Sequence, residues 1–173
     1  PEDSGLGGLD ARDQFVLNEI AALSVVDFLR LHDIQAQIKW PNDIYVGSRK
    51  ICGILIENSL RGNRLSSSII GIGLNINQRN FDVNLPNPTS MALCISGSYD
   101  IRKCLDEFMT IFTAYLERYL NITGGYLKLR KMYLSQLWRK DIEAVFIDYT
   151  TLPTGHLDGP MNIRPKNDPD SGI

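Results

Sequence analysis

Residues 39–55, KWPNDIYVGSRKICGIL, form the stretch that decides the fold. Two short apolar runs, 44–46 and 50–58, are joined by Gly47–Ser48, a pair typical of the turn in a β-hairpin. Pro41 has no backbone N–H and restricts the residue before it, so the strand that leads into the hairpin should end there. The stretch therefore predicts adjacent antiparallel strands with a stiff bend ahead of the hairpin.

The segments around this hairpin read as further strands and as helices. Asp10 is a suitable N-cap, and apolar residues at helical spacing predict a helix from about residue 15 to His32. Strands are expected at 34–40, 65–77 and 144–149, and helices at 90–95, 101–119 and 126–139. Because the strands follow one another instead of alternating with helices, the order predicts an α+β fold.

The bulk composition is that of an ordinary globular domain. The chain has 173 residues, of which 43% are hydrophobic and 22% charged, and a net charge of −2. A chain of this length buries enough surface without disulfides, and its charge gives no basic field for nucleic acid. The cysteines at 52, 94 and 104 show no CxxC pairing, and no apolar run is long enough to cross a membrane. We expect buried thiols and a soluble protein of the cytoplasm.

Lys50 and Asp43 are the residues most suited to chemistry. A lysine near a hairpin turn is in most proteins a solvated charge at the edge of a sheet. Here Asp43 lies on the opposite arm of the hairpin, and Pro41 fixes the direction in which Asn42 and Asp43 enter it. The pair is therefore a candidate site for a small anionic substrate.

Three other positions leave alternatives open. Gly53 interrupts a β-branched strand, either as a bulge or packing notch or to let a ligand approach the backbone. Gly71 and Gly73 lack the third glycine of a dinucleotide fingerprint and lead into an Asn/Pro-rich loop, so we expect them to clear a flat slot beside the sheet. Asn75 offers a donor and an acceptor at the end of that strand, although such residues more often cap a turn. The loop at 78–89 is long enough to be functional or mobile.

The remaining polar and apolar features indicate structural roles. His32 falls at a helix C-terminus, where a partly cationic ring is favourable, and His156 lies in a tail rich in proline, glycine and asparagine. The apolar stripe along 101–119 is expected to face the core.

The two motifs KWPNDIYVGSRKICGIL and IIGIGLNIN, the second at residues 69–77, closely resemble the biotin–protein ligase family, the biotin–[acetyl-CoA carboxylase] ligases. The resemblance covers about residues 10–140. It implies a mixed, largely antiparallel sheet flanked by helices, similar to class II aminoacyl-tRNA synthetases and lipoate ligases. It also implies that biotin and ATP react to biotinyl-5′-AMP, from which biotin passes to a lysine of a biotin carboxyl carrier protein.

The resemblance assigns roles to particular residues. Lys50 and Asp43 would be catalytic, Lys50, Cys52 and Gly53 would bind biotin, and the ATP-binding residues would be Lys39, Asn42 and Asn75. Mg²⁺ would be held largely by ATP oxygens, so that no residue of the protein is expected to be a metal ligand. A homodimer is possible, and the chain shows no basis for binding nucleic acid or a membrane.

The chain departs from the family pattern at both ends. The glycine/arginine-rich loop that closes over biotin in the family is not found in these residues. We therefore expect an N-terminally incomplete catalytic domain at 1–140 and a poorly structured remnant of the C-terminal region at 141–173, with doubtful activity of the chain by itself. Two alternatives remain open. One is a lipoate or octanoate ligase with the same architecture, and the other an inactive module for binding or dimerisation.

Overall fold

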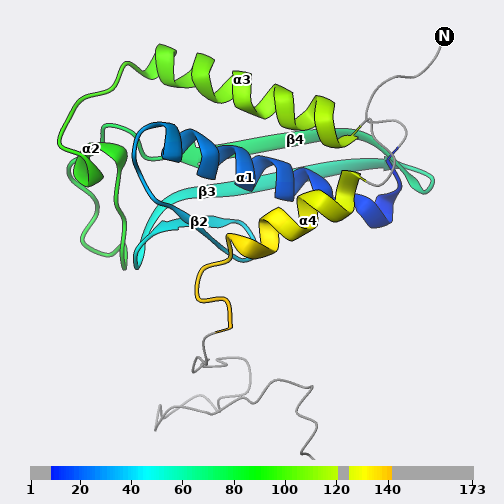
Figure 1. Cartoon of the computed structure of the whole chain (residues 1–173), viewed down its shortest axis with the longest axis horizontal. Coiled ribbons are helices and arrows are strands. Elements are labelled where there is room, and N and C mark those ends of the chain that lie inside the picture. Colours follow the sequence, from blue (N-terminus) through cyan, green and yellow to red (C-terminus); the bar gives the residue numbers. More distant parts are fainter. Residues whose placement is uncertain (1–8, 121–124, 142–173) are drawn as a thin grey trace, which may run out of the picture. The chain divides into compact units, whose positions relative to one another are not determined.

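The computed structural model of the chain describes residues 9–120 and 125–141, and the part up to Lys140 packs as one compact unit. A short 3-10 helix, η2, precedes helix α1, four strands follow, and three helices complete the described part (Figure 1). The elements are η2 (Ala11–Asp13), α1 (Phe15–Leu31), β1 (Gln37–Lys39), β2 (Asp43–Val46), β3 (Arg49–Arg61), β4 (Arg64–Leu74), α2 (Met91–Cys94), α3 (Ile101–Leu120) and α4 (Gly125–Ser135).

The described strands form one antiparallel sheet in the order β1-β2-β3-β4. Its β2–β3 turn contains Gly47, whose φ of 61° lies in the left-handed region that glycine adopts without steric cost. A register shift between Ile44 and Tyr45 marks a β-bulge in the same hairpin. The bulge matters because it changes which side chains of β2 and β3 meet across the ladder.

Helices cover one face of the sheet, with α1 between α3 and α4 (Figure 1). Helix α1 is buried along most of its length, and its residues Ile20, Val25 and Phe28 are fully enclosed. On the sheet, the core is completed by Ile38, Ile44 and other residues of the helix-facing side. Burial of this apolar surface is the main force that holds the layers together. None of the described helices covers the opposite face of β3 and β4, where Leu55 and Ile69 are exposed.

The α+β fold predicted from the sequence is confirmed, whereas Asp10 caps the 3-10 helix η2 and not α1, which begins after Gln14 without a side-chain cap bond. Asp10 accepts a hydrogen bond from the backbone N–H of Arg12, and Asp100 accepts two from the first turn of α3. Ser90 caps α2 by accepting from the backbone N–H of Leu93. Each cap pairs backbone donors that a helix leaves unsatisfied at its start.

Several predicted boundaries are wrong. Strand β1 covers only 37–39 of the expected 34–40, β4 ends at Leu74 instead of residue 77, and α4 ends at Ser135 instead of residue 139. The stripe on α3 is only partly core, since Ile101 is 62% and Leu105 56% exposed. These two side chains line a hollow beside β4, the last strand of the described sheet. The expected strand at 144–149, the tail and His156 lie outside the described residues.

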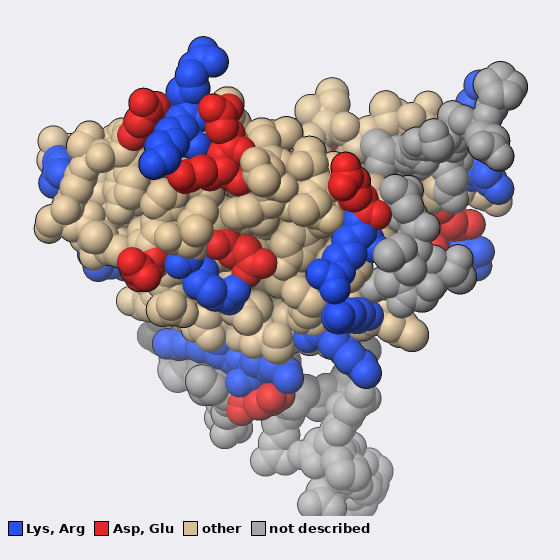
Figure 2. Space-filling model, turned by 45° about the horizontal axis from the view of Figure 1, so that its top comes forward, with Lys and Arg blue, Asp and Glu red and all other residues tan. Residues whose placement is uncertain are grey.

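The visible surface carries a mixture of charges. Figure 2 shows acidic and basic side chains next to one another on one face, with broad uncharged areas between them. Among the described residues, none of the helices is both long and apolar enough to cross a membrane.

Candidate functional site

The centre of the candidate site is an ion pair between strands β2 and β3. Lys50 Nζ lies 2.6 Å from Asp43 Oδ1. In the ladder, however, Lys50 pairs with Tyr45, while Asp43 pairs with Gly53. The lysine side chain therefore runs along β3 to reach the carboxylate, and it passes over Gly53.

Gly53 makes room for that path. A Cβ added at Gly53 would lie 3.3 Å from both Cε and Nζ of Lys50 and 3.7 Å from Asp43 Oδ1. The two 3.3 Å contacts are tighter than ordinary packing, so a side chain here would push the Lys50 ammonium aside. In the structure the group that passes over the Gly53 backbone is the Lys50 side chain, which fits a packing notch. The approach of a ligand to this backbone stays a prediction.

Two adjoining hollows surround the ion pair on the open face of the sheet. One has a volume of about 500 Å³ and the other of about 490 Å³. Both are lined by Asp43, Lys50, Gly53 and Gly73. Volumes of this order suit small-molecule ligands. The expected slot beside the glycines is thus present, and Gly71 lines the second hollow.

The loop after β4 forms a wall of the larger hollow. The backbone of this loop is hydrogen-bonded to both backbone groups of Lys50. Lys50 N donates to Asn87 O at 2.8 Å, and Thr89 N donates to Lys50 O at 2.8 Å. Asn75 Nδ2 donates to Thr89 O at 2.9 Å, so this amide holds the loop at the point where β4 ends. The loop adds Phe81, Leu85, Pro86, Asn87 and Pro88 to the lining. Its length had indicated a functional loop, but no local signal identified these five residues.

Two buried side chains fix the bend that carries Asn42 and Asp43. The carbonyl oxygen of Pro41 accepts from Asn18 Nδ2 of α1 at 2.7 Å and from the Tyr133 hydroxyl of α4 at 3.2 Å. Burial raises the pKa of Tyr133 to about 12, which keeps this hydroxyl a donor. Asn42 itself donates to Ile54 O at 2.8 Å and lines the smaller hollow.

Lys39 occupies a different place from the other expected site residues. Lys39 is not among the described residues that line the two hollows. Its Nζ instead donates to the Tyr45 hydroxyl at 3.1 Å. The same ammonium lies 4.9 Å from the centre of the Tyr45 ring and 5.9 Å from that of Trp138. Lys39 is thus next to the wall that Tyr45 contributes, not inside the cavity.

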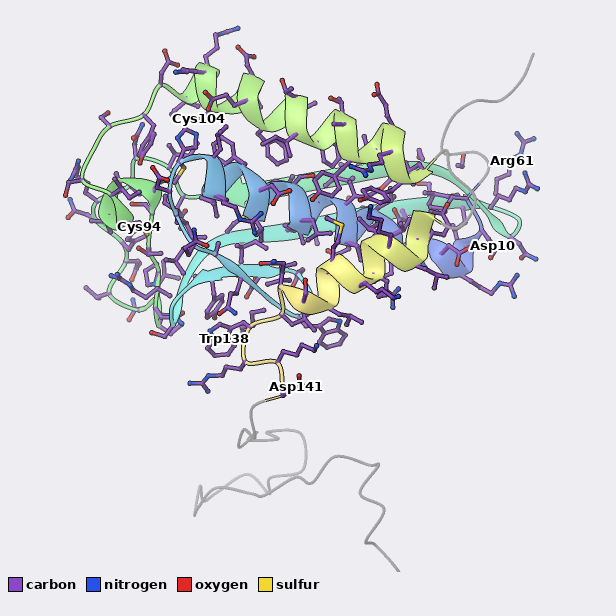
Figure 3. The ribbon with its side chains drawn as sticks, viewed as in Figure 1. Asp10, Arg61, Cys94, Cys104, Trp138 and Asp141 are labelled. Atoms are coloured by element: carbon purple, nitrogen blue, oxygen red, sulfur yellow. The ribbon has the colours of Figure 1, made fainter. Side chains whose placement is uncertain are left out.

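The cysteines are packing groups in the described structure. Cys52 is 1% exposed, and burial raises the pKa of its thiol to about 12, although the nearby Lys50 acts in the opposite direction. Cys104 is buried and Cys94 is half-buried, on α3 and α2 respectively (Figure 3). A protonated thiol at Cys52 is a poor nucleophile, so its contribution to the hollow is shape.

The sequence of residues 9–75 matches the Biotin/lipoate A/B protein ligase family. The bifunctional ligase/repressor BirA of Bacillus spizizenii is 45% identical over 67 residues, which are 38% of this chain and 21% of that protein. A biotin–[acetyl-CoA-carboxylase] ligase of Paracoccus denitrificans is 38% identical over 63 residues, 35% of this chain and 26% of that protein. The matches therefore span about a fifth to a quarter of the relatives' lengths.

Solved structures show the same fold. A biotin protein ligase from Aquifex aeolicus, in complex with biotin and ATP, has a TM-score of 0.61 at 24% identity and covers 71% of this chain and 51% of that chain. The ligase of Leishmania major, in complex with biotinyl-5-AMP, has a TM-score of 0.55 at 21% identity, over 83% and 60% of the two chains.

The described domain is an α+β domain with the fold of the solved biotin protein ligases. Residues 9–75, which contain the Lys50–Asp43 pair, are the part of the chain that matches the biotin/lipoate A/B protein ligase family. The family resemblance expected from the two motifs is confirmed.

Proposed function

We propose that this chain contains the substrate-activating site of a biotin–protein ligase. The observation that carries the proposal is the ion pair between Lys50 Nζ and Asp43 Oδ1, which are 2.6 Å apart. The pair lies above Gly53 in a hollow of ligand size. The lysine offers a cation to an anionic ligand, and Asp43 holds that cation in place. The family match and the relatives named as biotin ligases support biotin as the acid that is activated.

The proposed reaction has two steps. A carboxylate oxygen of biotin attacks the α-phosphorus of ATP, the bond from phosphorus to the bridging oxygen breaks, and pyrophosphate leaves. The amine of a carrier lysine then attacks the acyl carbon, AMP leaves with the electron pair of the broken C–O bond, and the amine proton passes to solvent. Lys50 would stabilise charge on the carboxylate and the α-phosphate, while Gly53 and Cys52 would shape the biotin side. Asn42, Asn75 and Lys39 would act on the ATP side.

Magnesium would act as a partner of the ATP phosphates. Among the described residues, no group of three or more histidine, cysteine, aspartate or glutamate side chains could hold a metal ion. Asp43 is already paired with Lys50. The described residues therefore do not fit a protein-held metal centre.

The proposal extends to the setting of the reaction. The partner would be a biotin carboxyl carrier protein domain, the protein would act in the cytoplasm, and a homodimer is compatible with the fold. Residues 1–140 would be the catalytic domain and 141–173 a remnant of the C-terminal region.

The decisive experiment supplies the chain with labelled biotin, ATP and a carrier domain. Label on the carrier supports the proposal, and a Lys50→Ala variant should lower adenylate formation by at least ~10²-fold, comparable to the loss of one oxyanion donor. Because the family also includes lipoate ligases, a parallel reaction with lipoate is needed. If lipoate but not biotin is transferred, the protein is a lipoate ligase. If the chain binds neither acid, it is an inactive module.

A further inference from the structure

The bend that leads into β2 is held from two sides, and helix α4 provides one of the contacts. On the side of the sheet, Ile54 N donates to Asn42 O at 2.8 Å, and Asn42 Nδ2 donates to Ile54 O at 2.8 Å. On the side of the helices, the Pro41 carbonyl oxygen accepts from the Tyr133 hydroxyl at 3.2 Å. Asp43 follows directly after these anchored residues, so the direction of its carboxylate depends on both sets of contacts.

The place of Tyr133 is fixed by its packing. The residue is 1% exposed, and its ring meets that of Phe15 on α1 edge to face, with the ring centres 5.8 Å apart. A buried hydroxyl that lacks an acceptor is costly, so the bond to Pro41 O ties the bend to a side chain that has little freedom to move.

The same carbonyl has a second donor, which limits the damage when one bond is lost. Asn18 Nδ2 of α1 donates to Pro41 O at 2.7 Å. A carbonyl oxygen has two lone pairs and can accept both bonds. Loss of the Tyr133 hydroxyl therefore leaves Pro41 O paired, and it should loosen the bend without unfolding the domain.

We propose that Tyr133 is a positioning residue for the activation step, which acts through the Pro41 carbonyl on the Asp43–Lys50 pair. The inference rests on the proposed function. Tyr133 is not among the described residues that line the two hollows, and α4 lies outside residues 9–75, so the family match gives this helix no role in the site. The hydroxyl holds the bend, the bend directs Asp43, and Asp43 keeps the Lys50 ammonium where the reacting carboxylate arrives.

The test measures pyrophosphate release by the full chain with biotin and ATP, and urea denaturation shows that each variant is folded. Tyr133→Phe removes only the hydroxyl and keeps the ring against Phe15. It should lower the rate of adenylate formation by about 10-fold, because small displacements of a reacting group have large effects on rate. Tyr115→Phe is the matched control, since it removes another largely buried hydroxyl, which donates to Asp27 at 2.7 Å. This variant should keep the wild-type rate.

A double variant separates positioning from a general structural role. In an Asp43→Asn background, Tyr133→Phe should cause little further loss of rate, because both changes act on the same ion pair. A loss of rate that came from general loosening of the fold would instead add to the effect of Asp43→Asn.

Amide hydrogen exchange gives a readout that does not require activity. The N–H of Ile54, whose acceptor is Asn42 O, should exchange about 10-fold faster in Tyr133→Phe relative to the amides of the β3–β4 ladder. The ladder amides correct for any change in global stability. In Tyr115→Phe the exchange of Ile54 relative to the ladder should stay as in wild type.

Four outcomes would overturn the inference. They are a wild-type rate in Tyr133→Phe, an equal loss of rate in Tyr115→Phe, additive losses in the double variant, and unchanged relative exchange at Ile54. If the wild-type chain forms no adenylate, the proposed function fails and the role in activation fails with it. The exchange measurement would then still show whether Tyr133 holds the bend.

Discussion

Lys50 and Asp43 meet across different rungs of the β2–β3 ladder. Lys50 is paired with Tyr45 and Asp43 with Gly53, yet their side-chain atoms are 2.6 Å apart. The contact is possible because Gly53 has no side chain in the path of the lysine. The pair is partly exposed, at 43% for the Lys50 and 24% for the Asp43 side chain, so its main value is the position of the ammonium and not stability.

Asp43→Asn should separate the effect of the ion pair on the position of the Lys50 ammonium from its effect on stability. The variant should form adenylate at least ~10²-fold more slowly, because the ammonium loses the group that holds it in place. Its free energy of unfolding should change by less than about 1 kcal/mol, as for other exposed ion pairs. Pyrophosphate release and urea denaturation measure the two quantities. Asp106→Asn, at an exposed position of α3, is the control and should alter neither. Normal turnover in Asp43→Asn would place the site elsewhere.

Gly53→Ala should damage the site and leave the fold intact. The new methyl group would lie 3.3 Å from Lys50 Cε and Nζ, and the flexible lysine side chain can move away from it. We expect adenylate formation to fall by about 10²-fold, since small displacements of a catalytic group have effects of this size. The midpoint of urea denaturation should stay close to that of wild type. Gly97→Ala, whose Cβ would make only an ordinary 3.5 Å contact with Ile95 O, should behave as wild type in both measurements.

The sequence predicted the parts of the site that depend on local structure. The Gly47–Ser48 turn between the apolar runs 44–46 and 50–58 indicated the hairpin, and the hairpin brought Asp43 and Lys50 together. The supports of that hairpin could not be predicted in the same way. Tyr133 and Trp138 reach it from about 90 residues further along the chain. The packing of α4 against α1 places Tyr133, and the pairing of residues 136–138 with β1 places Trp138.

The prediction that the apolar stripe of α3 faces the core was partly wrong for a related reason. Helical spacing indicates which residues share a face, but the amount of sheet beneath that face decides whether they are buried. In the described residues the sheet ends at β4, and the groove between β4 and α3 is lined by Ile101, Leu105 and Met109.

Cys52 should make stability fall at alkaline pH. Burial raises the pKa of its thiol from 9.0 to about 12. Below pH 9 both folded and unfolded chains keep the proton. Between pH 9 and pH 12 the unfolded chain loses a proton that the folded chain retains, so the free energy of unfolding decreases by up to about 1.4 kcal/mol per pH unit from this group.

Urea denaturation between pH 8 and pH 11 measures this contribution. Cys52→Ala should show a shallower decline than wild type, whereas Cys94→Ala should keep the wild-type slope. Tyr133, whose pKa burial also raises to about 12, acts in the same direction in all three proteins and cancels from the comparison. Equal slopes for wild type and Cys52→Ala would mean that the thiol ionises in the folded protein.

Arg130 should be essential for holding α4 against α1 near neutral pH. It forms an ion pair with Glu19, which is 1% exposed. Burial raises the pKa of Glu19, and Arg130 opposes that rise. Arg130→Met leaves a buried carboxylate without its cation, and it should lower the free energy of unfolding at pH 7 by about 3 kcal/mol.

The loss of stability in Arg130→Met should become smaller as the pH is lowered. Because the pKa of Glu19 is raised in the folded state, the protonated carboxyl favours the folded chain. This contribution to the free energy of unfolding is complete below the unfolded-state pKa of 4.5, and it is lost as the pH rises through the folded-state pKa. Without Arg130 the folded pKa rises further, and urea denaturation at pH 7, 6 and 5 should show Arg130→Met approaching wild type at the lowest pH. The double variant Glu19→Gln/Arg130→Met has no carboxyl at this position and should lose that recovery. Lys128→Met, an exposed change on the same helix, should follow the wild-type curve throughout. If the Arg130→Met and wild-type curves ran parallel, Glu19 would not be the titrating group.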